Sequence, residues 1–221
     1  MSGRNAEPGH ERARIDWYFD YVSPFAYLQS RRLDEVAALA DIRLRPVLFA
    51  GLLRHWQHKG PAEIPGKQLL TYRHAHWLAK RMGVPYRMPE HHPFNPLAAL
   101  RLTLALGCRR EVVDTIYNVI WGEGLRPDSE AGWRAILDRL GVSDAEALID
   151  APETKAALMR NYEEAVQAQI FGVPSFIAGG ELFWGVDCTD MLLDFLKNPS
   201  LFDEPGMAGL AGITASSIRR L

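Results

Sequence analysis

Cysteine is scarce in this 221-residue chain, which has only Cys108 and Cys188, far apart in the sequence. There is no C-x-x-C pair, and neither cysteine lies at metal-ligand spacing from other candidate ligands. A disulfide framework is therefore not expected, and we expect no metal site. A thiol–disulfide oxidoreductase is the least favoured class of enzyme.

The chain also lacks long apolar runs and any strong excess of charge. No run approaches the length of a membrane span. The formal net charge is -2, so there is no electrostatic reason to expect nucleic acid or a membrane surface as a partner. The N-terminus has no apolar segment typical of a secretory signal, which favours a cytoplasmic location. We interpret residues 1–14 and 199–221 as flexible or peripheral tails.

Aromatic residues gather near the start of the chain and indicate a first strand at residues 15–21, IDWYFDY. Ser23 follows this strand and is a residue type preferred at the N-cap of a helix, and a proline follows it at the first helical position. This predicts a helix that runs to about Ala40. Residues 42–49 alternate apolar and polar, which predicts a second strand, and Pro46 indicates a sheet edge or an early end.

Strand patterns then stop over a long middle segment. The pattern there predicts helices at 68–82, 95–106, 109–122, 129–140 and 152–169. Strand patterns return at 174–178 and 181–184, and the Gly-Gly between these two runs predicts a hairpin. A final helix is expected from about Asp187 to Lys197.

The predicted order is β-α-β, then a helical block, then β-β-α. It fits a four-stranded mixed sheet with a parallel first pair and an antiparallel hairpin. This α/β arrangement is the outline of a thioredoxin-like fold with an inserted all-helical domain. We expect the thioredoxin-like domain at 15–50 and 170–198, and the insertion at 51–169.

Ser23 stands where thiol oxidoreductases of this fold place C-x-x-C, yet the four residues here are Ser-Pro-Phe-Ala. A hydroxyl at this position can donate a hydrogen bond to a bound thiolate. The simpler interpretation is a plain helix cap, and this segment alone favours it. Later in the chain, Gly172-Val173-Pro174 opens a strand, and the corresponding proline of thioredoxin folds is cis. The backbone before such a proline can pair with an extended peptide ligand, although a loop proline entering a strand is the alternative.

Further residues are candidates on weaker grounds. Lys67 lies near a helix start, where a cation opposes the helix dipole, so it is either placed for a ligand or simply solvated. Asn95 and Asp187 are expected to cap the helices that follow them. The free N–H groups after Asp187 are also able to hold a carboxylate. The histidines, including the pair 91–92, are interpreted as polar surface or pocket lining rather than metal ligands.

Taken together and in order, the stretches DYVSPFAYL, PAEIPGK, FNPLAALR, WGEGLRPD, FGVPSF and FWGVD resemble the 2-hydroxychromene-2-carboxylate isomerase family. This family belongs to the DsbA-like, kappa-class glutathione transferase superfamily. The resemblance covers nearly all of the chain from Ile15 to about Leu196. It implies a thioredoxin-like domain with a helical insertion, glutathione as cofactor and a homodimer.

The resemblance also implies roles for residues. Ser23 matches the catalytic serine, which holds the glutathione sulfur as a thiolate. Val173 and Pro174 match the backbone site for the cysteinyl part of glutathione. The positions of Asp187 and Cys188 match those that bind the γ-glutamyl end. The resemblance also assigns three residues to the cleft where the family binds its substrate: Lys67, Asn95 and Phe25. Lys67 is the candidate partner of the glutathione and substrate carboxylates.

The implied reaction converts 2-hydroxychromene-2-carboxylate, an aromatic carboxylate, to trans-o-hydroxybenzylidenepyruvate through transient thiolate addition, as part of the breakdown of aromatic compounds. The sequence departs from the family pattern at Cys188, where the family usually has arginine, and at His58, which stands in place of an asparagine. Two alternatives stay open. One is a kappa-like glutathione transferase that acts on other electrophiles, and the other is a redox-inactive binding module.

Overall fold

The computed structural model describes residues 12–216. One four-stranded sheet lies at its centre, in the order β2-β1-β3-β4. β1 and β2 are parallel, whereas the pairs β1–β3 and β3–β4 are antiparallel. The strands are β1 (Ala13–Phe19), β2 (Ala40–Pro46), β3 (Ser175–Ala178) and β4 (Glu181–Trp184). The mixed thioredoxin-like sheet predicted from the sequence is therefore confirmed, with Pro46 as the last residue of an edge strand.

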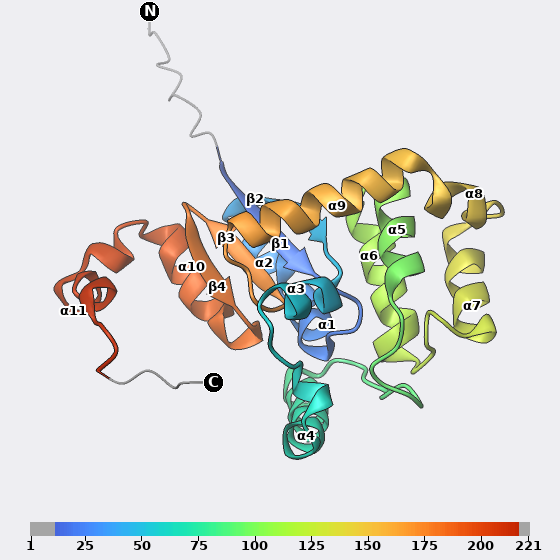
Figure 1. The fold of residues 1–221 in the computed structure, drawn as a ribbon, viewed down its shortest axis with the longest axis horizontal. Helices are drawn as coiled ribbons and strands as arrows, with labels where there is room; N and C mark the ends of the chain where they lie inside the picture. The colour runs from blue at the N-terminus through green and yellow to red at the C-terminus, as the bar shows by residue number, and fades with distance from the viewer. Residues whose placement is uncertain (1–11, 217–221) are drawn as a thin grey trace, which may run out of the picture.

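The rest of the described chain is mostly helical (Figure 1). Helices α5 to α8 stand beside the sheet, α9 crosses from them to the sheet, and α4 projects at the bottom of the view. The helices are α1 (Pro24–Ser30), α2 (Leu33–Ala37), α3 (Phe49–His55), α4 (Pro65–Met82), α5 (Leu97–Ala105), α6 (Arg110–Tyr117), α7 (Glu130–Leu140), α8 (Ala145–Asp150), α9 (Pro152–Gln167), α10 (Thr189–Lys197) and α11 (Pro205–Ala208). A π-helical turn, Asn118–Gly122, continues α6, and shorter 3-10 turns lie at 61–63, 186–188, 201–203 and 210–212.

The alternation of residues along β1 divides the buried side chains into two clusters. Neighbouring residues of a strand point to opposite faces of the sheet. Trp17 and Phe19 are fully buried in the larger cluster, which continues through α1, α5, α6 and α10. Tyr18 belongs to the smaller cluster with Leu52 of α3 and Ala165 of α9. Both faces of the sheet are thus covered, and the larger core runs without interruption into the helical segment. The domain bounds at 50/51 and 169/170 stay a prediction.

Several element bounds differ from the sequence prediction. The single helix expected up to Ala40 is two short helices, because Arg31 and Arg32 donate three-residue turn bonds to Leu28 and Gln29 that end α1. No glycine or proline marks this break. The second strand lies at 40–46 rather than 42–49. Helices α3 and α8 and the turns after Pro199 were not predicted.

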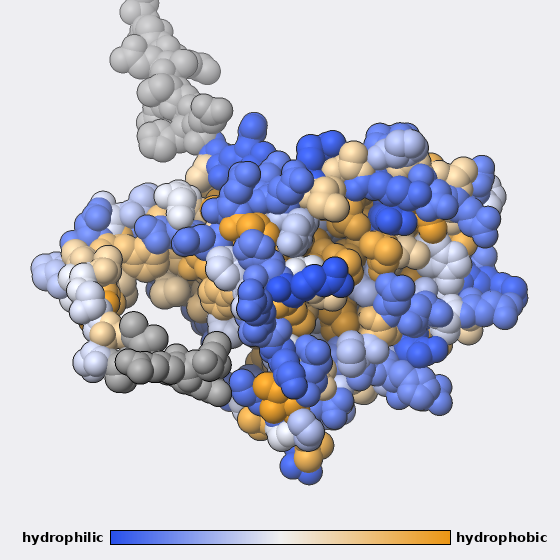
Figure 2. Space-filling model, in the orientation of Figure 1, coloured by the Kyte–Doolittle hydropathy of each residue, from blue (hydrophilic) through white to orange (hydrophobic). Residues whose placement is uncertain are grey.

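The surface carries its exposed large apolar side chains in a few places. Figure 2 shows apolar surface on the projecting α4, where Leu69, Leu70 and Trp77 are at least half exposed. Phe171 and Trp184 form a second exposed pair, with ring centroids 5.0 Å apart. No helix within residues 12–216 has the length and apolar character needed to cross a membrane.

Candidate active site

Ser23 connects the start of α1 to a loop 150 residues away. Its Oγ accepts a hydrogen bond from the Ala26 N–H at 3.2 Å, which confirms the predicted helix cap, with Pro24 at the first helical position. The same hydroxyl donates to the Val173 carbonyl at 3.3 Å. Ser23 and Val173 are only 7% and 8% exposed. The two parts of the sequence that suggested chemistry therefore meet at one nearly buried hydroxyl.

The loop that carries Val173 offers backbone groups beside this hydroxyl. The Val173–Pro174 peptide bond is cis. The Pro174 carbonyl accepts from the Gly185 N–H at 2.9 Å, which holds the loop to the end of β4. Between residues 12 and 216, no group accepts a hydrogen bond from the Val173 N–H. A backbone N–H is a strong donor that needs a partner, so this group is suited to an extended peptide ligand.

The backbone that leads to Ser23 is held by three side chains from the helical segment. The Asp20 carbonyl accepts from the Tyr117 hydroxyl at 3.2 Å, and the Tyr21 carbonyl accepts from the Trp121 indole at 2.8 Å. The His92 Nε2 lies 2.8 Å from the Val22 carbonyl. We call this set of three bonds the carbonyl clamp. It fixes the turn before Ser23 from outside the sheet.

The carboxyl group of Asp20 holds the same turn from within. It is fully buried and accepts from the Val22 N–H at 3.0 Å and from the Phe49 N–H, at the start of α3, at 2.8 Å. Burial raises the pKa of Asp20 from 3.8 to about 7, against the lowering effect of these N–H bonds. Asp20 therefore joins the Ser23 turn to α3 in a manner that depends on pH.

We predict a pH dependence of stability from Asp20. The Asp20 carboxyl group keeps its proton up to a pH of about 7 in the folded chain, whereas it releases the proton near pH 3.8 in the unfolded chain. Between these pH values the folded state binds more protons than the unfolded state, so the free energy of unfolding falls as pH rises. The total fall is up to about 4 kcal/mol, because the pKa of Asp20 differs by about three units between the two states. Asp20→Asn should remove this part of the fall in the free energy of unfolding, measured by urea unfolding at pH 4.5, 6 and 7.5. Asp187→Asn, at an exposed carboxylate, is the control, and equal slopes for all three chains would refute the prediction.

Phe25 and Lys67 belong to α1 and α4, which pack against each other. The half-buried ring of Phe25 lies 5.3 Å from the ring of His74 of α4, measured between centroids. Lys67 is exposed in the first turn of α4. No hydrogen bond or ion pair within the described residues joins Lys67 to Ser23. The structure thus places an aromatic contact beside α1 and an accessible cation at the start of α4.

Asn95 has a structural role that only partly matches the prediction. The N-cap position of α5 is Pro96 rather than Asn95, although the Asn95 Oδ1 still accepts from the Leu97 N–H at 3.0 Å. Its own N–H donates to the Asp128 carboxylate at 3.0 Å. Asn95 therefore ties the start of α5 to the loop before α7, and no hydrogen bond joins it to Ser23 among residues 12–216.

Asp187 and Cys188 lie in the connection between β4 and α10. The predicted cap by Asp187 is wrong, because a 3-10 turn precedes α10 and the cap position falls at Cys188. The exposed Asp187 carboxylate instead folds back toward Gly185, where φ is 89° and an added Cβ would lie 2.4 Å from its Oδ1. The Cys188 N–H donates to the Gly185 carbonyl at 3.3 Å. Burial, and then the charge of Asp187, raise the pKa of the Cys188 thiol.

Gln29 places this connection relative to α1. Its buried side-chain amide donates to the Gly185 carbonyl at 2.9 Å and to the Thr189 hydroxyl at 3.0 Å. Its carbonyl oxygen accepts from the Trp17 indole at 2.7 Å. Sequence reasoning missed Gln29, Asp20 and the carbonyl clamp, because a polar residue within an apolar pattern does not reveal a distant backbone partner. The available signals were the DYVSPFAYL stretch, which begins with Asp20, and the WGEGLRPD stretch, which begins with Trp121.

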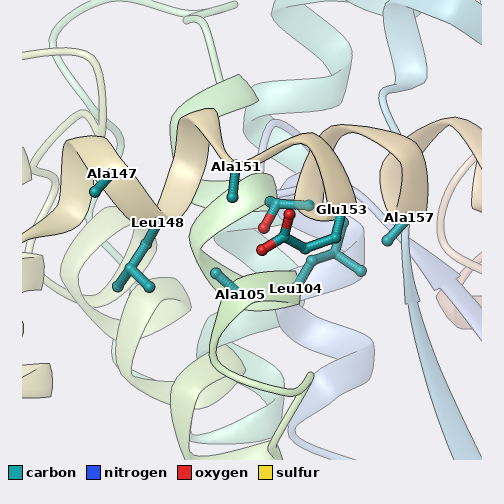
Figure 3. A pocket seen from close by; sticks show the side chains of 8 residues that line it. Leu104, Ala105, Ala147, Leu148, Ala151, Glu153 and Ala157 are labelled. Carbon is teal, nitrogen blue, oxygen red and sulfur yellow. The ribbon is translucent and has the colours of Figure 1, made fainter.

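Other features of the described chain lie away from Ser23. A hollow of about 420 Å³ between α5, α8 and α9 is lined by Leu104, Leu148, Glu153 and Thr154 together with four alanines (Figure 3). None of the predicted site residues lines it. Within residues 12–216, no group of three or more His, Cys, Asp or Glu residues is arranged to hold a metal ion.

Comparisons with known proteins agree with this geometry. A family model described as a DSBA-like thioredoxin domain matches residues 14–197. A 2-hydroxychromene-2-carboxylate isomerase of Pseudomonas putida is 29% identical over 80% of this chain and 91% of its own length. A kappa glutathione transferase of Caenorhabditis elegans is 25% identical over 85% of this chain and 93% of its own length.

Solved structures show the same fold. The structure of a 2-hydroxychromene-2-carboxylate isomerase superposes with a TM-score of 0.76 at 23% identity, over 86% of this chain and 97% of the other. The curated relatives are named as isomerases and glutathione transferases, which supports an enzymatic role. The family model spans most of the chain, and the mixed sheet with its helical segment has the matching architecture. The chain therefore belongs to the DsbA-like thioredoxin family, among relatives named 2-hydroxychromene-2-carboxylate isomerase.

Proposed function

We propose that this protein is a glutathione-dependent isomerase that converts 2-hydroxychromene-2-carboxylate to trans-o-hydroxybenzylidenepyruvate. The observation that carries the proposal is the Ser23 hydroxyl, 3.3 Å from the Val173 carbonyl, in a loop where the Val173 N–H has no partner among residues 12–216. Such a site suits a peptide-like ligand that carries a thiol, because the protein has no thiol at this position. Cys108 and Cys188 are not in the Ser-Pro-Phe-Ala segment, so the reactive sulfur has to come from a ligand.

Two features of the site fit glutathione. The Val173 N–H can donate to the carbonyl of a cysteinyl residue, in the manner of strand pairing. The Ser23 hydroxyl and the Ala26 N–H, now 3.2 Å apart, are the donors that can stabilise a sulfur anion. Donors to a charged acceptor make stronger hydrogen bonds than donors to a neutral one. The connection at Asp187 and Cys188, which Gln29 holds to α1, is assigned to the γ-glutamyl end.

When bound, glutathione would supply a thiolate nucleophile for reversible addition to the conjugated substrate. The chain's own residues have separate tasks in this proposal. Ser23 turns its hydroxyl from the Val173 carbonyl to the sulfur. Phe25 offers an aromatic face for the bicyclic substrate. Lys67, an exposed cation at the start of α4, attracts the carboxylates of glutathione and substrate. Asn95 is assigned to the substrate from the family resemblance alone.

The test is ring opening of 2-hydroxychromene-2-carboxylate, followed by absorbance with and without glutathione. We expect conversion by the protein only when glutathione is present, with no consumption of glutathione, because the reaction is an isomerisation. Conversion at the same rate without glutathione would sink the proposal. S-methylglutathione, which lacks the free thiol, is the matched control ligand and should not support the reaction.

Similarity to kappa glutathione transferases favours one second candidate, a transferase that acts on other electrophiles. Stoichiometric loss of glutathione with an aryl halide, and no ring opening of the chromene, would favour it. A redox-inactive binding module predicts turnover of neither compound and unchanged peptide binding after Ser23→Ala. We further propose, from the family resemblance, a cytoplasmic homodimer.

A further inference from the structure

His92 differs from the other two members of the carbonyl clamp in what lies behind it. Its Nδ1 lies 3.0 Å from the Tyr72 hydroxyl, which also lies 3.0 Å from the His92 carbonyl. The Gln68 amide donates to that hydroxyl at 3.2 Å. Gln68 and Tyr72 belong to α4. A continuous chain of hydrogen bonds therefore runs from the first turns of α4 to the carbonyl that precedes Ser23.

The chemistry of these contacts assigns the protons of the imidazole. The Val22 carbonyl can only accept, so Nε2 carries the hydrogen and Nδ1 of the neutral ring is an acceptor. The single Tyr72 hydroxyl hydrogen is shared between Nδ1 and the His92 carbonyl, each 3.0 Å from the Tyr72 oxygen. The imidazole packs edge-on against the rings of Phe94 and Trp121. Burial lowers the pKa of His92, which keeps the ring neutral at neutral pH. His92 is therefore a donor held in one orientation.

We infer that His92 is a positioning residue, which transmits the position of α4 to the Ser23 hydroxyl through the Val22 carbonyl. The inference rests on the proposed function, because it assigns Ser23 to the sulfur and α4 to the substrate side. Lys67 immediately precedes Gln68 at one end of this chain, and Phe25 of α1 contacts His74 of the same helix α4. A shift of α4 on substrate binding would thereby reach Ser23 without direct contact.

A thiol introduced at the site tests this role without glutathione or substrate. In Ser23→Cys, the Ala26 N–H is placed to donate to the new sulfur, so its thiol pKa should lie below the ordinary value of about 8.5. Thiolate absorbance near 240 nm reports this titration. The unchanged chain serves as the blank, because burial raises the pKa of the Cys108 thiol to about 11 and also raises that of Cys188.

The second substitution is then made in the Ser23→Cys chain. His92→Phe keeps a flat ring but removes the donor, and the thiol pKa should rise by about one pH unit, toward the ordinary value. His92→Gln retains a side-chain N–H and should restore most of the lower pKa. Tyr72→Phe leaves the turn untouched and should give a smaller rise. His91→Phe, at the neighbouring exposed histidine, should give none.

A purely structural role for His92 predicts a lower melting temperature and an unchanged thiol pKa. An unchanged pKa in folded His92→Phe overturns the inference, and where that chain does not fold, an unchanged pKa in Tyr72→Phe does so. This readout is independent of the proposed reaction. A protein without isomerase activity whose thiol pKa responds as stated refutes the proposed function and retains the positioning role.

Discussion

Ser23→Ala should lower the glutathione-dependent turnover of the chromene carboxylate by about 100-fold, because a hydrogen bond to a charged group contributes about 1.5–3 kcal/mol. The substitution removes the hydroxyl donor that we assign to the sulfur. It also removes the acceptor of the Ala26 N–H. Steady-state rates at saturating glutathione measure the first effect, and glutathione binding by calorimetry shows how far affinity changes with it.

Two matched variants separate the chemistry of Ser23 from its capping role. Ser129 caps α7 as Ser23 caps α1, accepting from the Gly132 N–H at 3.2 Å. Ser129→Ala should therefore lower the free energy of unfolding by about 1 kcal/mol, as expected for a lost cap, with turnover retained. Ser23→Asp keeps a preferred cap residue but places a negative charge where the thiolate should lie. It should stay folded and lose turnover as Ser23→Ala does.

The opposite pattern would identify Ser23 as a cap only. Turnover would then follow stability, with Ser23→Asp active and Ser23→Ala no more impaired than Ser129→Ala. This is the choice that the sequence segment alone left open.

Gly132→Ala should cost about 3 kcal/mol or more in the free energy of unfolding, as overpacking against backbone does. An added Cβ would lie 1.9 Å from the Arg126 carbonyl oxygen and 2.7 Å from its carbon. That carbonyl cannot easily move, because it accepts from the Ser129 N–H at 3.2 Å and from the Ser129 hydroxyl at 2.8 Å. In a chain of this size, such a loss lowers the melting temperature by about 10 °C.

Gly66 provides the control for Gly132. It also lies in the first turn of a helix, but an added Cβ there meets no atom within 4 Å. Gly66→Ala should raise the free energy of unfolding by about 0.5 kcal/mol, through the lower backbone entropy of the unfolded chain. Urea unfolding of both variants at one pH measures the difference. A Gly132→Ala chain as stable as Gly66→Ala would contradict the close approach of Arg126.

Local signals were sufficient for parts of the fold and the site. Ser-Pro indicated the start of α1, and Gly-Gly indicated the hairpin between β3 and β4, because capping and turn formation depend on a few adjacent residues. The contact of Ser23 with Val173 across 150 residues is not a local property. Only the likeness to a thioredoxin-like fold suggested that these two segments belong to one site.

Other parts depend on packing that no local pattern records. The break after Ser30 comes from turn bonds at Arg31 and Arg32, in a stretch without glycine or proline. Asp187 has a preferred cap residue type, yet the 3-10 turn moves the helix start past it. The donors of the carbonyl clamp are aromatic or histidine side chains, which the sequence pattern indicates only as core or surface residues. Their roles depend on backbone partners 70 to 100 residues away.

The carbonyl clamp also shows how residues 51–169 support the turn that follows β1. All three donors come from between residues 51 and 169, whereas the accepting carbonyls follow β1. Excision of that segment would leave all four strands, but the turn before Ser23 would lose every one of these bonds. In the proposed enzyme, the orientation of Ser23 would thus depend on contacts between the sheet and residues 51–169. Grafting Ser-Pro-Phe-Ala onto a smaller scaffold of the same topology would transfer the residues without the support that orients them.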